Sequence, residues 1–333
     1  MKEINSVAVE KLNLAFVGLG WIGRNRMEAL LESGVAKAAY LVDCDESMVC
    51  DIIKDAQICS SLEQIVPHNI DGVVIATPSA MHAEQSIYAM ESGCAVFCQK
   101  PLARTALECK QVIETSKRNN KLLGVDFSYR FLKSVQIVRE IVESGELGEI
   151  YSADCVFHNA YGPDKAWFYD KKLSGGGCVM DLGVHLIDLI LWLLKFPKVH
   201  SVSSTLFCKG ENLPPQSLKI EDYANFSIEL ESGTVARFTC SWGLHAGKNA
   251  LIEITLYGTE GALSIKNVNG SFYDFRLERY SQTSTQVLCE PPDNWGPGAI
   301  MDWAERLSAG QGFDTKSDQY LRVSEVIDKI YGR

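Results

Sequence analysis

The sequence lacks the excess of basic residues that is typical of proteins that bind nucleic acids or acidic membranes. Its 333 residues include 32 Lys or Arg and 42 Asp or Glu, which gives a formal net charge of −10. A chain of this charge repels phosphate backbones and anionic lipids. We therefore expect neither a nucleic acid nor a membrane as a partner.

Long hydrophobic runs are also missing. The most apolar stretch, HLIDLILWLLKF from His185, is too short to span a bilayer and contains Asp188, so it predicts a buried helix. The N-terminal stretch MKEINSVAVEKLN has neither the apolar core nor the cleavage site of a signal peptide. We expect a cytoplasmic protein.

The sequence has no C-x-x-C motif, although it contains 11 cysteines; in the closest pair, Cys94 and Cys98, three residues intervene. Most cysteines lie in apolar runs such as YSADCVFH and ARFTCSW. This predicts buried free thiols in a reducing compartment. Cys178, Asp181 and His185 lack a fourth ligand and match no zinc pattern, so we expect no metal.

Short apolar runs alternate with helical patterns over the first 130 residues. The runs are LAFVG, KAAYLVD, DGVVIAT, AVFC and LLGVDF, and the helical segments include RMEALLES, ESMVCDIIKDA, AMHAEQSIYAMESG and TALECKQVIETSKRNN. Ser60 with Glu63, and Thr105 with Glu108, have the spacing of helix capping boxes. Near-continuous apolar strands between helices are typical of a parallel sheet covered on both faces.

The pattern changes after about residue 150. Seven segments show partial alternation of apolar and polar residues: YSADCVFH, VHSVSSTLFC, YANFSIELE, TVARFTCSW, LIEITLYG, GALSIKN and SFYDFRLERY. Tight turns such as Ser232-Gly233 and GTEG at 258–261 join several of them, which predicts an antiparallel sheet. A helix is expected over 181–194, and two more near AIMDWAERLSAG and SDQYLRVSEVIDKIYG.

Three glycines, Gly18, Gly20 and Gly23, stand where the first strand runs into the first helix. Backbone N–H groups at a helix N-terminus hold the pyrophosphate of a dinucleotide, and glycines let it approach. Asp43 ends the second strand 20 residues after Gly23, where a carboxylate accepts hydrogen bonds from ribose hydroxyls. A glycine-rich turn in a nucleotide-free domain is the alternative.

The carboxylate of Asp43 also bears on the choice of cofactor. It would repel a 2′-phosphate, and the next residues, Cys44, Asp45 and Glu46, supply no cation. We therefore expect NAD, with NADP less favoured. The expected fold class is α/β: a Rossmann domain with a parallel sheet over 1–130, and over 131–333 a substrate-binding and oligomerisation domain with an open, mainly antiparallel sheet. Its C-terminal helix could pack back on the first domain.

Further polar residues follow the later strands. Thr77, Pro78 and His82 follow DGVVIAT, Lys100 with Pro101 follows AVFC, and Tyr129 with Arg130 follows LLGVDF. Gly175, Gly176 and Gly177 then precede a helix that carries Asp181, His185 and Asp188. Asp181 and His185 are four residues apart and so share a helical face, where the carboxylate could orient the imidazole.

At these residues the sequence resembles the glucose–fructose oxidoreductase / inositol dehydrogenase (Gfo/Idh/MocA) family over essentially its whole length. The most specific matches are Lys100-Pro101 and the run from Gly175 to Asp188. The resemblance implies that Lys100, Asp181 and His185 face the nicotinamide across the cleft between the domains. One departure is Gln99, where the family often has Glu.

The resemblance implies hydride transfer between NAD(H) and a secondary alcohol or ketone of a polyhydroxylated substrate. The hypothesis makes His185 the general acid/base, oriented by Asp181, and Lys100 the donor to the reacting oxygen; the reverse assignment, with Lys100 moving the proton, stays open. The expected cofactor-binding residues are Gly18, Gly20, Trp21, Ile22, Gly23, Asp43, Thr77, Pro78, His82, Gln99 and Lys100. The expected substrate-binding residues are Lys100, Tyr129, Arg130, His158, Trp167, Asp181 and His185.

Alternatives remain at the sequence level. Lys100 and His185 could be an ordinary surface lysine and a structural histidine, Asp188 could brace structure, Trp167 could belong to the core, and His82 could be a helix-face residue. Tyr161, Lys165, Phe168, Lys171 and Lys172 are further candidates for substrate contact. The substrate is expected to be a sugar, cyclitol or sugar derivative, with a nucleotide sugar or amino sugar as an alternative. A non-catalytic dinucleotide-binding sensor or assembly protein is the alternative of another class.

The sheet of the second domain also suggests an assembly. Strands such as YANFSIELE and LIEITLYG are expected to place large apolar residues on both faces, of which one layer of helices covers only one. We therefore expect a homodimer or homotetramer joined through this sheet. The alternative is that the segment from Pro291 onward folds over the open face.

Overall fold

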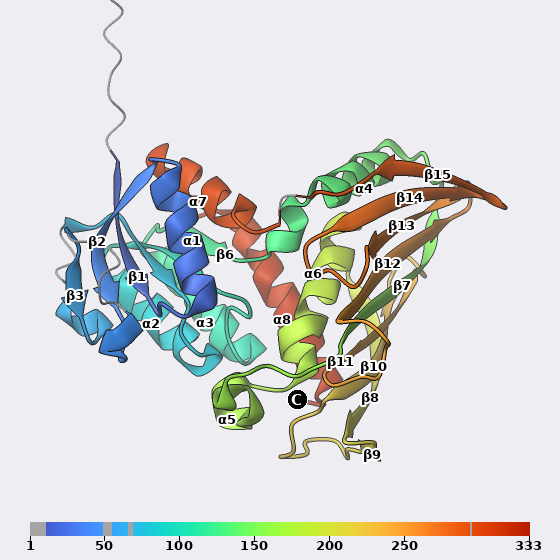
Figure 1. The fold of residues 1–333 in the computed structure, drawn as a ribbon, viewed down its shortest axis with the longest axis horizontal. Coiled ribbons are helices and arrows are strands. Elements are labelled where there is room, and N and C mark those ends of the chain that lie inside the picture. Colours follow the sequence, from blue (N-terminus) through green and yellow to red (C-terminus); the bar gives the residue numbers. More distant parts are fainter. Residues whose placement is uncertain (1–10, 49–54, 66–68, 294) are drawn as a thin grey trace, which may run out of the picture.

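The fold is described from a computed structural model, which covers residues 11–48, 55–65, 69–293 and 295–333. Within these residues two sheets stand side by side with helices between and around them (Figure 1). The first is a parallel six-stranded sheet in the order β3-β2-β1-β4-β5-β6, the order of a Rossmann fold. Its strands are β1 (Leu12–Val17), β2 (Ala36–Val42), β3 (Gln57–Cys59), β4 (Gly72–Ile75), β5 (Ala95–Cys98) and β6 (Leu123–Val125).

Helices cover both faces of this sheet, as its near-continuous apolar strands predict. Helix α1 (Trp21–Glu32) lies on one face with α7 (Gly298–Ser308), whose Trp303 packs on Phe97. Helices α2 (Ser79–Glu91) and α3 (Ala106–Arg118) lie on the other. Gly72 and Gly124 leave room for Trp303, since a Cβ at either position would lie 2.8 Å from its ring.

The two expected capping boxes have different outcomes. Thr105 caps α3, because its hydroxyl accepts a hydrogen bond from the Glu108 amide at 3.1 Å. The prediction at Ser60 is wrong: only a 3-10 turn (Leu62–Gln64) forms there, with Ser61 before it, and the Ser60 amide bonds the Gln64 side chain. The helix expected at 46–56 lies partly outside the described residues, which show a 3-10 turn at Glu46–Met48.

The second sheet has the order β15-β14-β13-β12-β7-β11-β10-β8-β9 and is mainly antiparallel, with one parallel pair, β7 and β11. Its strands are β7 (Ile150–Asn159), β8 (Val199–Cys208), β9 (Glu211–Asn212), β10 (Tyr223–Leu230), β11 (Val235–Ser241), β12 (Ala250–Gly258), β13 (Gly261–Asn267), β14 (Phe275–Ser281) and β15 (Ser284–Cys289). The helices α4 (Lys133–Ser144), α6 (Val184–Leu193) and α8 (Asp318–Ile330) lie on one face of this sheet (Figure 1). The short helix α5 (Lys171–Ser174) lies apart from this layer, in contact with α2.

The uncovered face of this sheet carries both polar and apolar side chains, so the expectation of large apolar residues on both faces holds for some strands and not for others. In β10, Phe226 and Ile228 are buried on the helix side, while Asn225 and Glu229, which flank them in the chain, are exposed. Arg237 of β11 pairs with Asp154 of β7 at 2.7 Å on the uncovered face. In β12, by contrast, Leu251 and Tyr257 lie on the uncovered face, where Leu251 is paired with His158. Assembly through this face therefore stays a prediction.

The C-terminal segment does not cover that face either. Helix α7 packs on the first sheet, and α8 packs on α3, α6 and β8, where the Ser204 hydroxyl donates to the Ile330 carbonyl at 2.7 Å. The alternative proposed from the sequence, in which the C-terminal segment covers this face, is therefore wrong.

The apolar helix is part of the core. Within the described residues, Lys171–Leu193 is the one helical stretch whose length and composition would allow a membrane crossing, and 89% of its most apolar window is buried. The helix expected over 181–194 begins as a π-helical turn (Val179–Gly183) and continues as α6. The ten described cysteines are free, and seven of them are buried.

Candidate functional site

The glycine turn between β1 and α1 has the shape of an anion cradle. Gly18 has a φ of +85°, and a Cβ on it would lie 2.7 Å from the Ala76 backbone. A Cβ on Gly23 would lie 2.0 Å from the Gly18 oxygen. Around Gly20, by contrast, nothing lies within 4 Å of a Cβ position, and no side chain caps the start of α1. Gly18 and Gly23 are thus required by the fold, whereas Gly20 leaves open space at a helix N-terminus, where a pyrophosphate fits.

Asp43 lies at the end of β2, beside this turn. Its Oδ2 accepts a hydrogen bond from the Leu19 amide at 2.8 Å, and its Oδ1 accepts one from the Asp45 amide at 3.0 Å. The sequence suggested that no cation is near. In space Arg24 of α1 is close, because its guanidinium donates to the Met48 carbonyl at 3.1 Å, in the loop after Asp43. The preference for NAD therefore rests on the Asp43 carboxylate and not on the absence of a nearby cation.

His82 connects two loops at the carboxyl edge of the sheet. Its ring nitrogens lie 2.7 Å from the carbonyl oxygens of Pro101 and Thr77. Burial lowers the pKa of His82, although the two carbonyl contacts act in the opposite direction. Both ring nitrogens face backbone carbonyls, and the N–H of the neutral ring donates to one of them, so His82 positions the loops on which Thr77 and Lys100 stand.

Lys100 and Asp181 form an ion pair that connects the two parts of the chain. Lys100 follows β5 of the first sheet, and its Nζ donates to Asp181 Oδ1 at 2.9 Å and to the Asp181 carbonyl at 2.8 Å. The second oxygen of Asp181 accepts from Trp242 Nε1 at 3.1 Å. Both partners keep part of their surface open, at 19% and 16% exposed. The pair is therefore fixed yet accessible.

His185 lies one turn after Asp181 in the chain and is buried. Its ring centroid is 4.9 Å from that of Tyr129, at an interplanar angle of 62°, and its Nδ1 has no hydrogen-bond partner among the described residues. The pKa of His185 lies well below its usual value, mainly because the ring is buried and to a smaller extent because the positive charges of Lys100 and Arg26 are near. The expected orientation by Asp181 is not what these contacts show: Asp181 bonds Lys100 and Trp242, and the aromatic contact with Tyr129 holds the imidazole.

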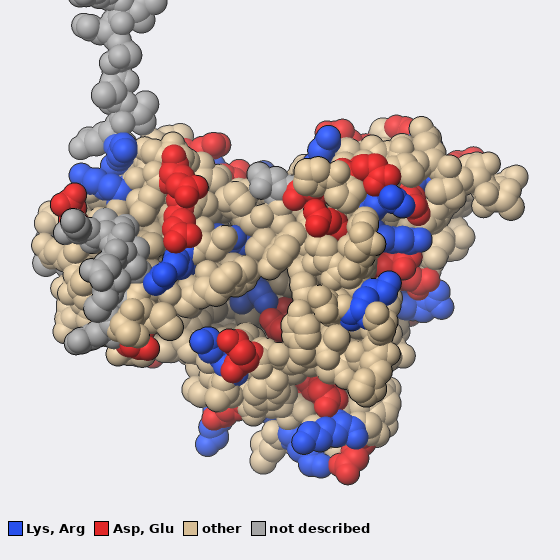
Figure 2. Space-filling view, in the orientation of Figure 1, with Lys and Arg blue, Asp and Glu red and all other residues tan. Residues whose placement is uncertain are grey.

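These groups meet in a cavity of about 400 Å³ between the two sheets. Figure 2 shows the hollow, in which basic and acidic side chains both appear. Among the residues expected from the sequence, the cavity is lined by Gly20, Trp21, Ile22, Thr77, His82, Gln99, Lys100, Tyr129, Lys165, Trp167, Phe168, Asp181 and His185. The rings of Trp167 and Phe168, in the segment after β7, stack on each other at 3.8 Å, and both residues line the cavity.

Two expected substrate contacts are wrong. Arg130 does not line the cavity but forms a buried, two-point ion pair with Asp188, with Nε to Oδ2 at 2.8 Å and Nη2 to Oδ1 at 2.5 Å. His158 lies on the other face of the sheet, since its neighbour Phe157 packs on the helix side. Its Nδ1 is 2.8 Å from the Ser241 hydroxyl, and its ring stacks on Tyr223.

The sequence reasoning missed several residues that line the cavity. Trp295, from the segment between β15 and α7, stacks on Trp21 at 6.1 Å and 13°, and the Arg26 guanidinium lies 5.1 Å from its ring. Arg26, Asp126 and Met180 also line the cavity. No local pattern marks these residues, because each reaches the site through contacts far along the chain.

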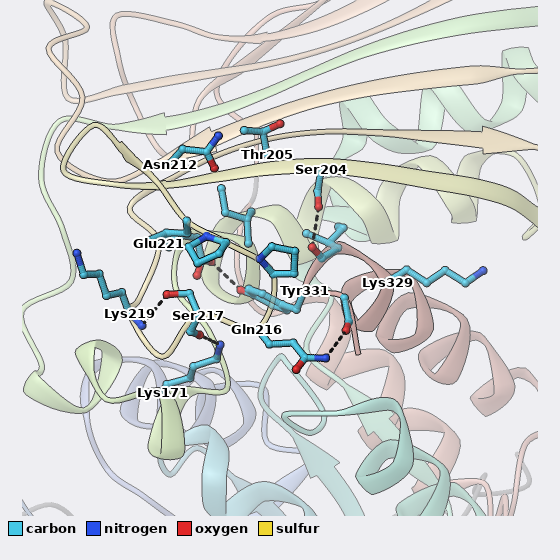
Figure 3. Close-up of a pocket in the computed structure, with 16 residues that line it drawn as sticks. Lys171, Ser204, Thr205, Asn212, Gln216, Ser217, Lys219, Glu221, Lys329 and Tyr331 are labelled. Carbon is cyan, nitrogen blue, oxygen red and sulfur yellow. Dashed lines mark hydrogen bonds between the residues drawn. The ribbon is translucent and has the colours of Figure 1, made fainter.

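The glycine run before the π-helical turn is explained by close packing. A Cβ on Gly176 would lie 2.0 Å from the Tyr331 hydroxyl, and one on Gly177 would lie 1.9 Å from the Glu221 carbonyl. Glu221 is buried, and its Oε1 accepts hydrogen bonds from the amides of Gly177 and Val179. The same oxygen accepts one from the Tyr331 hydroxyl at 2.6 Å (Figure 3). A carboxylate at this helix start is favourable and fixes the turn that carries Asp181.

Comparison with known proteins agrees with this geometry. A model described as "Oxidoreductase family, NAD-binding Rossmann fold" matches residues 12–127, and one described as "GFO/IDH/MocA C-terminal domain" matches residues 135–264. The chain belongs to the Gfo/Idh/MocA family. The resemblance seen in the sequence is thereby confirmed, as is the fold class.

Individual relatives cover different shares of the chain. D-glucoside 3-dehydrogenase of Escherichia coli (strain K12) is 31% identical over 206 residues. The matched part spans 59% of this chain and 58% of the relative, less than two thirds of its length. Inositol 2-dehydrogenase 3 of Saccharopolyspora erythraea is 28% identical over 323 residues, or 93% of this chain and 84% of the relative. The solved structure of levoglucosan dehydrogenase in complex with NADH superposes with a TM-score of 0.80 at 21% identity and covers 97% of both chains, which shows a shared fold.

The residues of this Gfo/Idh/MocA protein fit a nicotinamide dinucleotide. The open space at Gly20 leads to an uncapped helix N-terminus, and Asp43 stands beside it at the end of β2. Further along the strand ends, the cavity is lined by Lys100 and by His185, whose Nδ1 is buried and has no partner among the described residues.

Proposed function

We propose that the protein is an NAD-dependent dehydrogenase or reductase that acts on a CH–OH group of a polyhydroxylated small molecule. The observation that carries the proposal is the partly open Lys100–Asp181 ion pair beside buried His185, at the carboxyl edge of an NAD-binding sheet. The relatives named as glucoside and inositol dehydrogenases support this class of activity. A dinucleotide-binding protein without catalysis would not require these three side chains together.

The roles of the side chains follow from their surroundings. The bound nicotinamide supplies or accepts the hydride. Lys100 Nζ, held by Asp181, is placed to donate a hydrogen bond to the reacting oxygen and to stabilise its developing negative charge. His185, kept neutral by burial and two nearby cations, accepts the hydroxyl proton in the oxidative direction. The reverse assignment, in which Lys100 moves the proton, predicts a different pH profile.

The cavity favours an uncharged polyhydroxylated ring. An outer face of the stacked Trp167–Phe168 pair suits the apolar face of a sugar or cyclitol. Each cation that lines the cavity within the described residues has a carboxylate near it: Arg26 pairs with Asp126, Lys100 with Asp181, and Lys165 with Asp164. This arrangement supports a neutral sugar or cyclitol over a nucleotide sugar. The cytoplasmic location and the homo-oligomer also remain proposals.

The test of this function is a substrate panel. Neutral sugars, cyclitols, glycosides and nucleotide sugars are each incubated with the protein and NAD⁺, and NADH absorbance is followed. We expect reduction of NAD⁺ with at least one neutral polyol. Reduction with none of them, by a protein that binds NADH, would support the non-catalytic reading.

Asp43→Ala is expected to relax the preference for NADH over NADPH. The change removes the carboxylate that repels a 2′-phosphate and leaves Arg24 beside the same loop. Fluorescence titration of both cofactors gives the dissociation constant of NADPH divided by that of NADH. We expect this ratio to fall by about tenfold or more, as for the loss of a charged interaction. Equal or tighter binding of NADPH by the unchanged protein would show that Asp43 does not lie on the ribose.

The rate of alcohol oxidation is expected to stay level as the pH falls through 6.5. The pKa of His185 is lowered well below 6.5, so the ring remains neutral and able to accept a proton in that range. A profile of kcat/KM from pH 5 to 9 checks this. An acidic limb near 6.5 that disappears in His185→Gln would contradict the neutral-histidine account.

A further inference from the structure

Three buried polar side chains form a cluster beside the catalytic groups. Arg26 of α1, Gln99 after β5 and Asp126 after β6 all line the cavity. Arg26 Nε donates to Asp126 Oδ2 at 2.7 Å, and Gln99 Nε2 donates to the same oxygen at 2.5 Å. Arg26 is 1% exposed and Asp126 is 2% exposed. One oxygen of the Asp126 carboxylate therefore receives both donors.

The other oxygen receives none. Asp126 Oδ1 is buried and has no hydrogen-bond partner among the residues that the structure describes. A buried carboxylate oxygen without a donor is unfavourable, and such atoms in folded proteins call for an explanation. Because Asp126 lines the cavity, a donor on a bound ligand can supply the missing bond.

The strand order identifies the part of the ligand that passes Asp126. The glycine turn follows β1, and Asp43 follows β2 on one side of it. Strands β4, β5 and β6 continue the sheet on the other side, and Gln99 and Asp126 follow the last two. A dinucleotide with its adenosine ribose at Asp43 and its pyrophosphate at Gly20 therefore directs its nicotinamide half toward β5 and β6.

We propose that Asp126 Oδ1 accepts a hydrogen bond from the nicotinamide half of the dinucleotide, either from a hydroxyl of its ribose or from its carboxamide. The amide of Gln99 fits this role for Asp126. A carboxylate at position 99 would place a second negative charge beside the buried Arg26 guanidinium, whereas the amide donates to Asp126 and leaves Oδ1 for the ligand. The inference rests on the proposed function only in taking a nicotinamide dinucleotide as the ligand.

The test compares three ligands by isothermal titration: NADH, ADP-ribose, which lacks the nicotinamide, and ADP, which lacks both groups. They are titrated into the unchanged protein, Asp126→Asn, and the double variant Gln99→Glu/Asp126→Asn. The double variant keeps a carboxylate beside Arg26 and so preserves the charge of the cluster if the single variant folds poorly. Asp154→Asn, which breaks an Asp–Arg pair on the uncovered face of the second sheet, is the matched control.

In both Asp126 variants the dissociation constant for NADH is expected to rise by about tenfold to a hundredfold, as for a lost hydrogen bond to a charged group, while that for ADP stays unchanged. If the dissociation constant for ADP-ribose rises as much as that for NADH, the donor is a hydroxyl of the ribose. If only the dissociation constant for NADH rises, the donor is the carboxamide. Unchanged NADH binding in both variants, or an equal loss for ADP, overturns the inference. If the unchanged protein binds none of the three ligands, the proposed function fails as well.

Discussion

Lys100→Ala is expected to lower turnover by about a hundredfold to a thousandfold, the usual effect of removing a fixed donor that stabilises charge in a transition state. Lys100 Nζ is held at 2.9 Å from Asp181 Oδ1, while 19% of the side chain stays open to the cavity. The donor is therefore in place before the substrate arrives. NADH binding is expected to change little, because the glycine turn and Asp43 hold the other half of the dinucleotide.

Steady-state rates and an NADH titration on the same preparation separate these two effects. Lys110→Ala is the matched control, since this lysine lies on the surface of α3 and pairs only loosely with Glu114 at 3.8 Å. Near-normal turnover in Lys100→Ala would remove the ion pair from the mechanism.

Gly20→Ala is expected to weaken NADH binding by about tenfold to a hundredfold without unfolding the protein. Gly20 has φ −61° and ψ 179°, which alanine adopts readily, and no atom lies within 4 Å of the added Cβ. The methyl group would instead occupy the space that the pyrophosphate needs. Melting temperature and NADH affinity are measured together.

Gly23→Ala provides the contrast. Its Cβ would lie 2.0 Å from the Gly18 oxygen, so this change is expected to lower the melting temperature itself. If Gly20→Ala binds NADH as tightly as the unchanged protein, the pyrophosphate does not pass this glycine.

The parts of the fold that depend on local patterns could be predicted from the sequence. The glycine spacing, the apolar strands and Asp43 are consecutive features of a single strand–helix–strand unit, so a reader of the sequence finds them together. Thr105 and Glu108, three residues apart, predicted the start of α3 correctly, and the structure contains the expected bond.

Residues whose role depends on which face they occupy could not be assigned in this way. His158 and Phe157 are neighbours in β7 and point to opposite faces, so a shift of one residue decides which of them approaches the cavity. Arg130 follows a strand end, as the site residues do, but it is paired with Asp188, which is 58 residues away. A sequence pattern does not reveal which carboxylate a guanidinium will meet.

The cluster of Arg26, Gln99 and Asp126 shows the same limit within the site. Arg26 and Asp126 are 100 residues apart and become neighbours only in the fold, where the Arg26 side chain from α1 reaches the residue that follows β6. Gln99 was visible in the sequence as a departure from the family pattern, but its meaning depends on the two partners that the fold brings to it.

The most direct test of the account follows the hydride itself. The best neutral substrate from the panel is prepared with deuterium on its reacting carbon and incubated with the protein and NAD⁺, and the reduced cofactor is analysed by mass spectrometry. The account predicts NADH that carries one deuterium, formed by the unchanged protein and largely lost in Lys100→Ala. Reduced cofactor without deuterium, or deuterated cofactor formed equally fast by Lys100→Ala, would contradict hydride transfer at this site.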